Sequence, residues 1–267
     1  MSEPAYVAEA RNMAAAVRQG MHLGFEAVAE IFHLIEEFGL PVVRRNMKED
    51  GPDGIYASNG EIAVAVINTS RPLTRQHFTA AHELGHHVFD PGIGVQIDEN
   101  IFHQEGIREK RANAFAAHFL MPEDSIRNLL SKNRRKLVVT PQDIVHFCHH
   151  FSVSPEAIIY QVHNIGLINS SDRNKFISMN KEGTLKTIEW ECGYLPNADN
   201  HGERRELLPA DYVKRAISTY VSGKISLDRL AELLEWSDVQ LLRDSLEAAN
   251  VRPAAGIDNY LEDVERA

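Results

Sequence analysis

The stretch TAAHELGHHVFDPG, residues 79–92, holds three histidines within six positions, and a glutamate directly follows the first of them. Residues four apart on an α-helix lie on one face about one turn apart, so the rings of His82 and His86 can point at a single ion. Neutral imidazole nitrogen is a good zinc ligand. The spacing therefore predicts a metal site on a helix.

Glu83 follows His82 but is rotated by about 100° around the helix axis. This rotation keeps the carboxylate off the ion and lets it reach a water molecule in the open coordination position, so we predict that Glu83 is a catalytic general base. The competing interpretation is a surface helix with solvated histidines. That interpretation explains His87, but it explains neither the spacing of His82 and His86 nor the glutamate between them.

The surrounding residues favour a helix that packs on a core. We expect it to begin with Thr74 as its cap and to end near Phe89, where Asp90, Pro91 and Gly92 stop it. Its inner side would consist of Phe78, Ala81, Gly85, Val88 and Phe89.

A catalytic zinc ion usually has three protein ligands and one water molecule, so the sequence must supply one more ligand. Glu109 is our choice, because it begins an apolar helix at about residues 108–120 that can pack against the motif helix. His118 lies nine positions later and hence on roughly the opposite face of that helix. Two weaker candidates precede the helix, His103 and Glu105.

Asn113 lies one turn after Glu109 on the same helix face. Its amide oxygen could accept the free ring N–H of His82 or His86 and so fix the tautomer of the ligand. We predict that Asn113 supports the metal site without binding the ion.

Short β-branched runs precede the motif helix and are bounded by Pro, Gly and Asn, as is typical of strands. They predict a small antiparallel sheet at residues 41–46, 54–58 and 61–70. Two helices between residues 5 and 38 would come before it, separated near Gly20 to Gly24. The predicted fold class is therefore α+β, with a mainly helical domain around the predicted zinc site, a small antiparallel sheet and a helical C-terminal region.

Two signals of a cap followed by proline, at Thr140 and Ser154, predict short helices at residues 141–150 and 155–163. The pair at 140–164 resembles a helix-turn-helix and closes a first domain at residues 1–168. Residues 169–205 are polar and broken by Gly and Pro, with strand-like pieces at 175–179 and 185–190, which predicts a linker or a small hairpin layer.

Residues 206–267 predict a second helical region, which we expect to dock other proteins. Its helices are expected at residues 209–222, 226–235 and 237–250, with Ser226 and Ser237 as caps of the last two. Residues 251–267 would form a loosely attached tail.

The formal net charge of -10 argues against broad attraction to nucleic acid or to anionic membranes. SPEAIIYQVHN, residues 154–164, has no Lys or Arg, and SDVQLLRDSLEAAN, residues 237–250, has one Arg against three acids. A helix that reads the major groove normally brings cationic and amide groups, so direct DNA binding is disfavoured. With no leader and no long apolar run, we expect a cytoplasmic protein.

Four segments together resemble the ImmA/IrrE family of metallopeptidases: AVAVINTS, RPLTRQHFTAAHELGHHVFD, EKRANAFAAHFLMPED and FSVSPEAIIYQVHNIGLIN. The similarity runs over about residues 5–168. It implies that His82 and His86 bind zinc, that Glu83 activates water and that Glu109 is the third ligand. One departure is Arg111, which stands where many members have an acidic residue.

The resemblance also implies a function. Members of the family are cytoplasmic endopeptidases that cut one protein, typically a helix-turn-helix repressor of the Xre type, and so derepress genes for stress response or mobile-element transfer. Zinc is the expected cofactor, although the ligand types leave manganese and iron open. The alternative is a non-catalytic metal-binding transcriptional regulator or scaffold in a repressor or toxin–antitoxin system, which the intact Glu83 disfavours.

Overall fold

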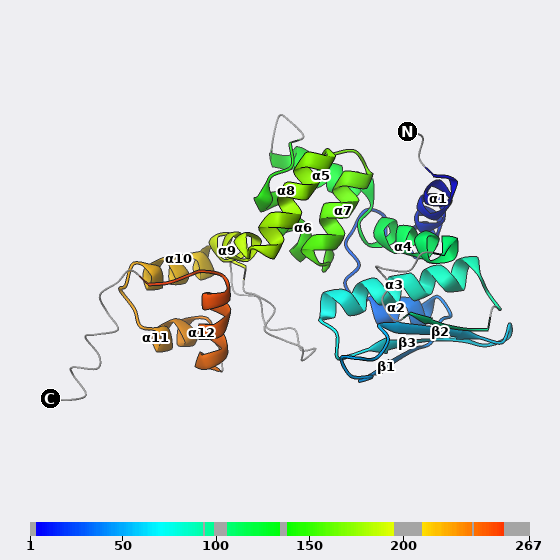
Figure 1. The fold of residues 1–267 in the computed structure, drawn as a ribbon, viewed down its shortest axis with the longest axis horizontal. Coiled ribbons are helices and arrows are strands. Elements are labelled where there is room, and N and C mark those ends of the chain that lie inside the picture. The colour runs from blue at the N-terminus through cyan, green and yellow to red at the C-terminus, as the bar shows by residue number, and fades with distance from the viewer. Residues whose placement is uncertain are drawn as a thin grey trace. The chain divides into compact units, whose positions relative to one another are not determined.

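A computed structural model describes residues 4–92, 94–98, 106–133, 138–194, 210–236 and 238–253 (Figure 1). The chain forms two compact units, Met1–Arg173 and Asn174–Ala267. Each unit buries its own apolar core. Within the described ranges, every helix is too short or too polar to cross a bilayer.

The N-terminal unit contains a four-stranded sheet in the order β1-β3-β2-β4. β2 pairs antiparallel with both of its neighbours, whereas β1 runs parallel to β3, with Val42 opposite Ala65. The α+β class is thus confirmed, but the sheet is mixed and not antiparallel throughout. The strands are β1 (Val42–Arg45), β2 (Gly54–Ser58), β3 (Ala63–Asn68) and β4 (Val95–Asp98).

The parallel pair arises because β3 inserts between β1 and β2, which are consecutive in the chain. The side chain of Asn68, at the end of β3, forms hydrogen bonds with the loop that connects β1 to β2. Its Nδ2 donates to the carbonyl oxygens of Lys48 and Pro52, both at 2.9 Å, and its Oδ1 accepts from the backbone N–H of Met47 at 3.0 Å. A buried amide of this kind is satisfied only in one loop arrangement.

Helix α3 (Leu73–Phe89) packs on the sheet and carries the histidine motif. Figure 1 shows α3 between the sheet and helix α4 (Ile107–Leu120), and α4 in turn packs against α1 (Ala5–Gly20). The short helix α2 (Ile31–Glu37) also contacts α3. Every residue of α3 from Gln76 to His86 is buried, so the motif lies in the core and not on a solvated face.

The capping signals at Thr140 and Ser154 are confirmed. Thr140 forms a capping box with Asp143 at the start of α6 (Pro141–Phe151), and the Ser154 side chain accepts from the N–H of Ala157 in α7 (Pro155–Asn164). The predicted cap at Thr74 was wrong. α3 begins at Leu73 after Pro72, which has no side-chain hydrogen bond and directs the chain into the helix through its fixed φ of -52°.

The segment from residue 169 to 194 corrects a prediction, because it is helical and not a linker or hairpin layer. Helix α8 (Ser170–Lys181) and helix α9 (Thr184–Glu191) meet at Gly183, whose φ of +79° turns the chain between them. The apolar residues that resembled a strand lie three apart at Leu185 and Ile188, so both are buried on one helix face. The end of the predicted hairpin layer, residues 195–205, lies outside the described residues.

The C-terminal unit surrounds a core of Trp190, Leu230, Leu234 and Leu242. Ser226 caps α11 as predicted, whereas the cap of α12 is Asp238, and the predicted Ser237 lies outside the described residues. Val251 packs into this core, so the first residue of the predicted tail is not loose. The remaining helices are α5 (Glu123–Asn133) in the first unit and α10 (Ala210–Val221), α11 (Leu227–Leu233) and α12 (Val239–Ala248) in the second.

Candidate metal centre

Three side chains from α3 and α4 converge on one point. The Nε2 atoms of His82 and His86 lie 3.0 Å apart, and Oε2 of Glu109 lies 3.2 Å from the first and 3.3 Å from the second. Both histidines are fully buried, and the side chain of Glu109 is 15% exposed. The structure therefore brings the predicted ligands together, and only Glu109 among them is in part exposed to solvent.

The separations of these atoms fit a metal ion. Zinc binds nitrogen and oxygen ligands at about 2.0–2.1 Å, which in a tetrahedral arrangement places the ligand atoms about 3.3 Å apart. The observed separations of 3.0–3.3 Å are close to this value. In the part of the chain that the structure describes, this is the one group of three His, Cys, Asp or Glu side chains with such a geometry.

Gly85 lets the two helices approach closely enough to share the ligands. A methyl group on Gly85 would lie 3.2 Å from the Cα atom of Ala112 and 3.2 Å from the ring of Phe115. These contacts are tighter than ordinary packing, so a side chain here would push α4 away. Glycine at this position therefore favours the close packing of α3 and α4 that brings the three side chains together.

Asn113 holds the ring of His82 from the side opposite the ligand atom. The Oδ1 atom of Asn113 lies 2.9 Å from Nδ1 of His82, so Nδ1 carries the proton and donates it to the amide oxygen. Nε2 is then unprotonated and presents its lone pair to the cluster. The amide thereby selects the tautomer that can bind a metal.

Burial raises the pKa of the Glu109 carboxyl, but hydrogen bonds and charge interactions with the protonated forms of His82 and His86 outweigh burial and hold this pKa well below its usual range. Glu109 is therefore ionised at neutral pH. An anionic oxygen and two imidazole nitrogens form a donor set that zinc accepts.

Glu83 is fully buried and stands apart from the three ligand atoms. Its carboxylate lies against the start of β2, where a methyl group on Gly54 would come within 2.1 Å of Oε1. The strand thus forms one wall of the space around Glu83. A buried carboxylate that directly follows a ligand on the same helix and stays outside the cluster is suited to the role of a general base.

Two contacts around α3 were not predicted from the sequence. Tyr56, buried on β2, places its hydroxyl 3.2 Å from Nδ1 of His87 and its ring 6.3 Å from that of His86. Burial raises the pKa of this hydroxyl. Arg111 donates to both carboxylate oxygens of Asp90, at 2.9 and 3.1 Å, and so ties α4 to the end of α3. Only the tertiary structure brings Tyr56 to His87 and Arg111 to Asp90.

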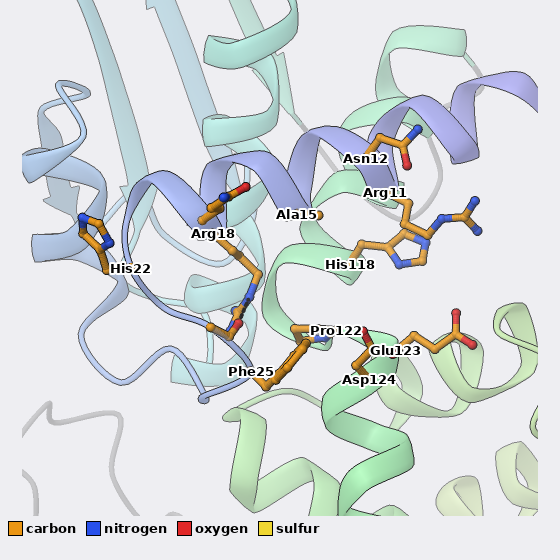
Figure 2. Close-up of a pocket in the computed structure, with 12 residues that line it drawn as sticks. Arg11, Asn12, Ala15, Arg18, His22, Phe25, His118, Pro122, Glu123 and Asp124 are labelled. Carbon is orange, nitrogen blue, oxygen red and sulfur yellow. Dashed lines mark hydrogen bonds between the residues drawn. The ribbon is translucent and has the colours of Figure 1, made fainter.

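The other candidate ligands do not join the cluster. His118 is on the opposite side of α4, where its Nδ1 lies 3.3 Å from Nε2 of Gln161. It lines a separate cavity of about 650 Å³ between α1 and the start of α5, together with Arg11, Glu123 and Asp124 (Figure 2). No ligand of the proposed centre lines this cavity. His103 and Glu105 lie outside the described residues.

The comparison with known families agrees with this geometry. Residues 35–163 match the model of a peptidase family described as the IrrE N-terminal-like domain. No curated protein matches the chain significantly. The matched range contains β1, β2, β3, α3 and α4, and therefore all three side chains of the cluster and Glu83. The match identifies residues 35–163 as an IrrE N-terminal-like peptidase domain and supports membership in the ImmA/IrrE family.

Proposed function

We propose that this protein is a zinc-dependent endopeptidase that cuts a specific peptide bond in a regulatory protein. The observation that carries the proposal is the cluster of His82, His86 and Glu109, together with the buried Glu83, which follows His82 on the same helix. The peptidase family of residues 35–163 supports the same reaction class.

The residues divide the chemistry between them. A zinc ion held by His82, His86 and Glu109 would supply Lewis-acid chemistry, polarising the peptide carbonyl and making water more acidic. Glu83 removes a proton from the attacking water, whose oxygen forms a bond to the carbonyl carbon. Glu83 then gives this proton to the amine nitrogen as the C–N bond breaks. Asn113 keeps His82 in the tautomer that presents Nε2 to the cluster.

For the substrate we propose a helix-turn-helix repressor of the Xre type, whose cleavage would derepress stress-response or mobile-element genes. The support is the resemblance to ImmA/IrrE peptidases. Two features favour a protein partner over DNA. The chain has a formal net charge of -10, and helix α7 contains no Lys or Arg. Helix α7 is the second helix of the pair that resembles a helix-turn-helix.

We further propose that the C-terminal unit docks the substrate. A peptidase that acts on one folded target needs recognition surface outside its cleft. Exposed apolar side chains on α10 and α12, Tyr212, Val221 and Leu241, would supply part of such a surface. Deleting residues 170–267 should abolish cleavage of the target in cells while metal binding persists; cleavage at the full rate by the shortened chain would disprove the docking role.

The decisive experiment compares new protein N-termini in host cells that express the wild type, Glu83→Gln or Glu123→Gln. Glu83→Gln removes the base but keeps the metal ligands, whereas Glu123→Gln changes a glutamate of α5 that pairs with Arg127. We expect one transcription factor to be cut by the wild type and by Glu123→Gln only. Equal N-termini in all three, with metal bound, would instead favour a non-catalytic regulator or scaffold.

Metal analysis of the purified protein tests the cofactor independently. We expect one zinc ion per chain in the wild type and in Glu83→Gln, and none in His86→Ala. Manganese or iron in place of zinc would correct the choice of metal without affecting the peptidase proposal.

A further inference from the structure

The contact between Gly54 and Glu83 is close enough to control where the carboxylate lies. A methyl group on Gly54 would stand 2.1 Å from Oε1 of Glu83 and 2.5 Å from Cγ2 of Thr79. Gly54 is not among the glycines with positive φ, so its backbone conformation suits any residue. Glycine is required here only because the backbone of β2 lies so close to Glu83. This backbone limits where the Glu83 carboxylate can lie.

Asp53 directly precedes Gly54, and both oxygens of its carboxylate accept hydrogen bonds. Oδ1 accepts from Nε of Arg71 at 2.7 Å, and Oδ2 accepts from Arg75, at 2.5 Å from Nη2 and 3.2 Å from Nε. The side chain of Asp53 is only 2% exposed, whereas the two arginines are about a quarter exposed. The backbone carbonyl of Asp53 also accepts, from the N–H of Asn68 at 3.0 Å. A buried carboxylate with two cationic partners fixes the strand end firmly.

Arg75, one of the two arginines that bind Asp53, lies on the same face of α3 as Glu83. Arg75, Thr79 and Glu83 are spaced four residues apart on α3, so they follow one another along one side. The hydroxyl of Thr79 donates to the carbonyl of Arg75 at 2.9 Å. The chain therefore meets this helix face at two consecutive residues. Asp53 contacts Arg75, and Gly54 lies against Thr79 and Glu83. The contact of Asp53 sets the position of Gly54.

We propose that Asp53, held by Arg71 and Arg75, is a positioning residue that keeps Gly54 against Glu83 and thereby fixes the general base relative to the metal ligands. The proposal rests on the proposed function, because it assigns a base role to Glu83. Asp53 and its two arginines contribute no atom to the cluster of His82, His86 and Glu109. Loss of the ion pairs of Asp53 with Arg71 and Arg75, here called the Asp53 clamp, should therefore move Glu83 and leave the metal in place.

A purely structural ion pair would behave differently, and a double-mutant cycle separates the two cases. If Asp53 acts through Glu83, substituting Asp53 has no further effect once Glu83 has been replaced. If it only stabilises the fold, its effect adds to that of Glu83→Gln. Each variant is made in the full chain, and its thermal midpoint and metal affinity, from competition with a chelator, are measured alongside.

Acetohydroxamate is a probe that reports on the base without any peptide substrate. A hydroxamate binds a metal ion as an anion, and the proton of its hydroxyl passes to a carboxylate next to the ion. Its affinity for the cobalt-loaded protein, followed by the visible spectrum of the cobalt, therefore depends on where Glu83 lies. Misplacing a reacting group by about 1 Å costs up to about 100-fold.

We expect Asp53→Asn to weaken acetohydroxamate binding by at least about tenfold with unchanged metal affinity. Gly54→Ala should weaken it to about the level of Glu83→Gln, because the new methyl group displaces the Glu83 carboxylate. The same methyl group would lie 2.5 Å from Cγ2 of Thr79, so the thermal midpoint of this variant is compared with that of the wild type. Arg75→Lys keeps the charge but loses the two-point contact and should fall between. Arg127→Lys, in the ion pair with Glu123 on α5, is the matched control and should bind as the wild type does.

The proposal is overturned if Asp53→Asn and Gly54→Ala both bind acetohydroxamate normally, if they lose the metal, or if Asp53→Asn weakens binding equally in the Glu83→Gln background. A failure of the proposed function gives a different pattern. The Asp53 clamp would then still control acetohydroxamate binding, but no protein in the host would be cut in a manner that depends on Glu83.

Discussion

Asn113 and His82 form a contact of 2.9 Å between Oδ1 and Nδ1 that decides which ring nitrogen of His82 faces His86 and Glu109. The two residues come from different helices, so this contact also fixes the rotation of α4 relative to α3. Glu109, one turn earlier on α4, is thereby directed at the same point as Nε2 of His82. The hydrogen bond thus sets both the tautomer and the third ligand.

Replacing Asn113 should weaken the metal site without removing a ligand. We expect Asn113→Ala to lower zinc affinity by about 10- to 100-fold, because His82 loses the acceptor that orders its ring. Asn113→Asp keeps an acceptor oxygen and should stay within a few-fold of the wild type. Chelator competition measures the affinity, and Asn128→Ala on the exposed side of α5 is the control. Equal affinity in Asn113→Ala and the wild type would contradict the assigned role.

Enlarging Gly85 should separate the ligands. Gly85→Val places methyl groups where even one Cβ would lie 3.2 Å from Ala112, so α4 must move away and Glu109 with it. We expect zinc affinity to fall by more than about tenfold, because a tetrahedral site tolerates little change in ligand separation. Gly20→Ala, which meets nothing within 4 Å, is the matched control and should bind zinc normally. Normal zinc binding in Gly85→Val would show that the helices can separate without cost.

Arg18 should matter for stability and not for the metal. Its buried guanidinium donates to the carbonyls of Phe119, Gly24 and Glu26, at 2.6, 2.9 and 2.5 Å. Burial lowers the pKa of Arg18 to about 10, so the group is still charged at pH 7. Arg18→Met leaves three carbonyls without their donor and should reduce the free energy of unfolding by about 2–4 kcal/mol.

Urea unfolding measures this loss, with Arg127→Met as the control. Arg127 forms a half-exposed pair with Glu123, and removing such a pair should cost less than about 1 kcal/mol. Similar losses in the two variants would show that the buried bonds of Arg18 contribute no more than a surface pair.

His77 should make the protein less stable in mild acid. Burial lowers the pKa of His77 to about 4, and the ring lies edge-on to Phe32 with centroids 5.6 Å apart. Between pH 6.5 and about 4 the unfolded chain binds a proton at this position and the folded chain does not. As the pH decreases through this range, the contribution of His77 lowers the free energy of unfolding by about 1.4 kcal/mol per pH unit. Below about pH 4 this contribution causes no further loss.

His77→Gln should remove this contribution, because glutamine has no proton to gain. Free energies of unfolding from pH 4.5 to 7.5 should show a smaller decline for the variant than for the wild type. His33→Gln, which changes a histidine with a 72% exposed side chain, should keep the wild-type decline. Parallel curves for the wild type and His77→Gln would contradict the buried neutral state.

The local parts of this protein could be read from its sequence. The motif helix, the capping box at Thr140, the N-cap at Ser154 and the helical C-terminal region follow from periodicity and from hydrogen bonds that span at most four residues. The strand-like pieces in residues 175–190 misled, because β-branched and aromatic residues at Ile188 and Trp190 occur on buried helix faces as well.

The sequence by itself determined that His82, Glu83 and His86 share one helix with ligand spacing, since the helical repeat fixes those positions without any other part of the chain. Only the tertiary structure decided which downstream residue completes the cluster, where Glu83 rests and which way β1 runs. Glu109 reaches His82 across 27 residues, and Asp53 reaches Arg75 across 22. Contacts at such separations depend on how helices and strands pack, and Gly54 and Gly85 allow that packing through the side chains they lack.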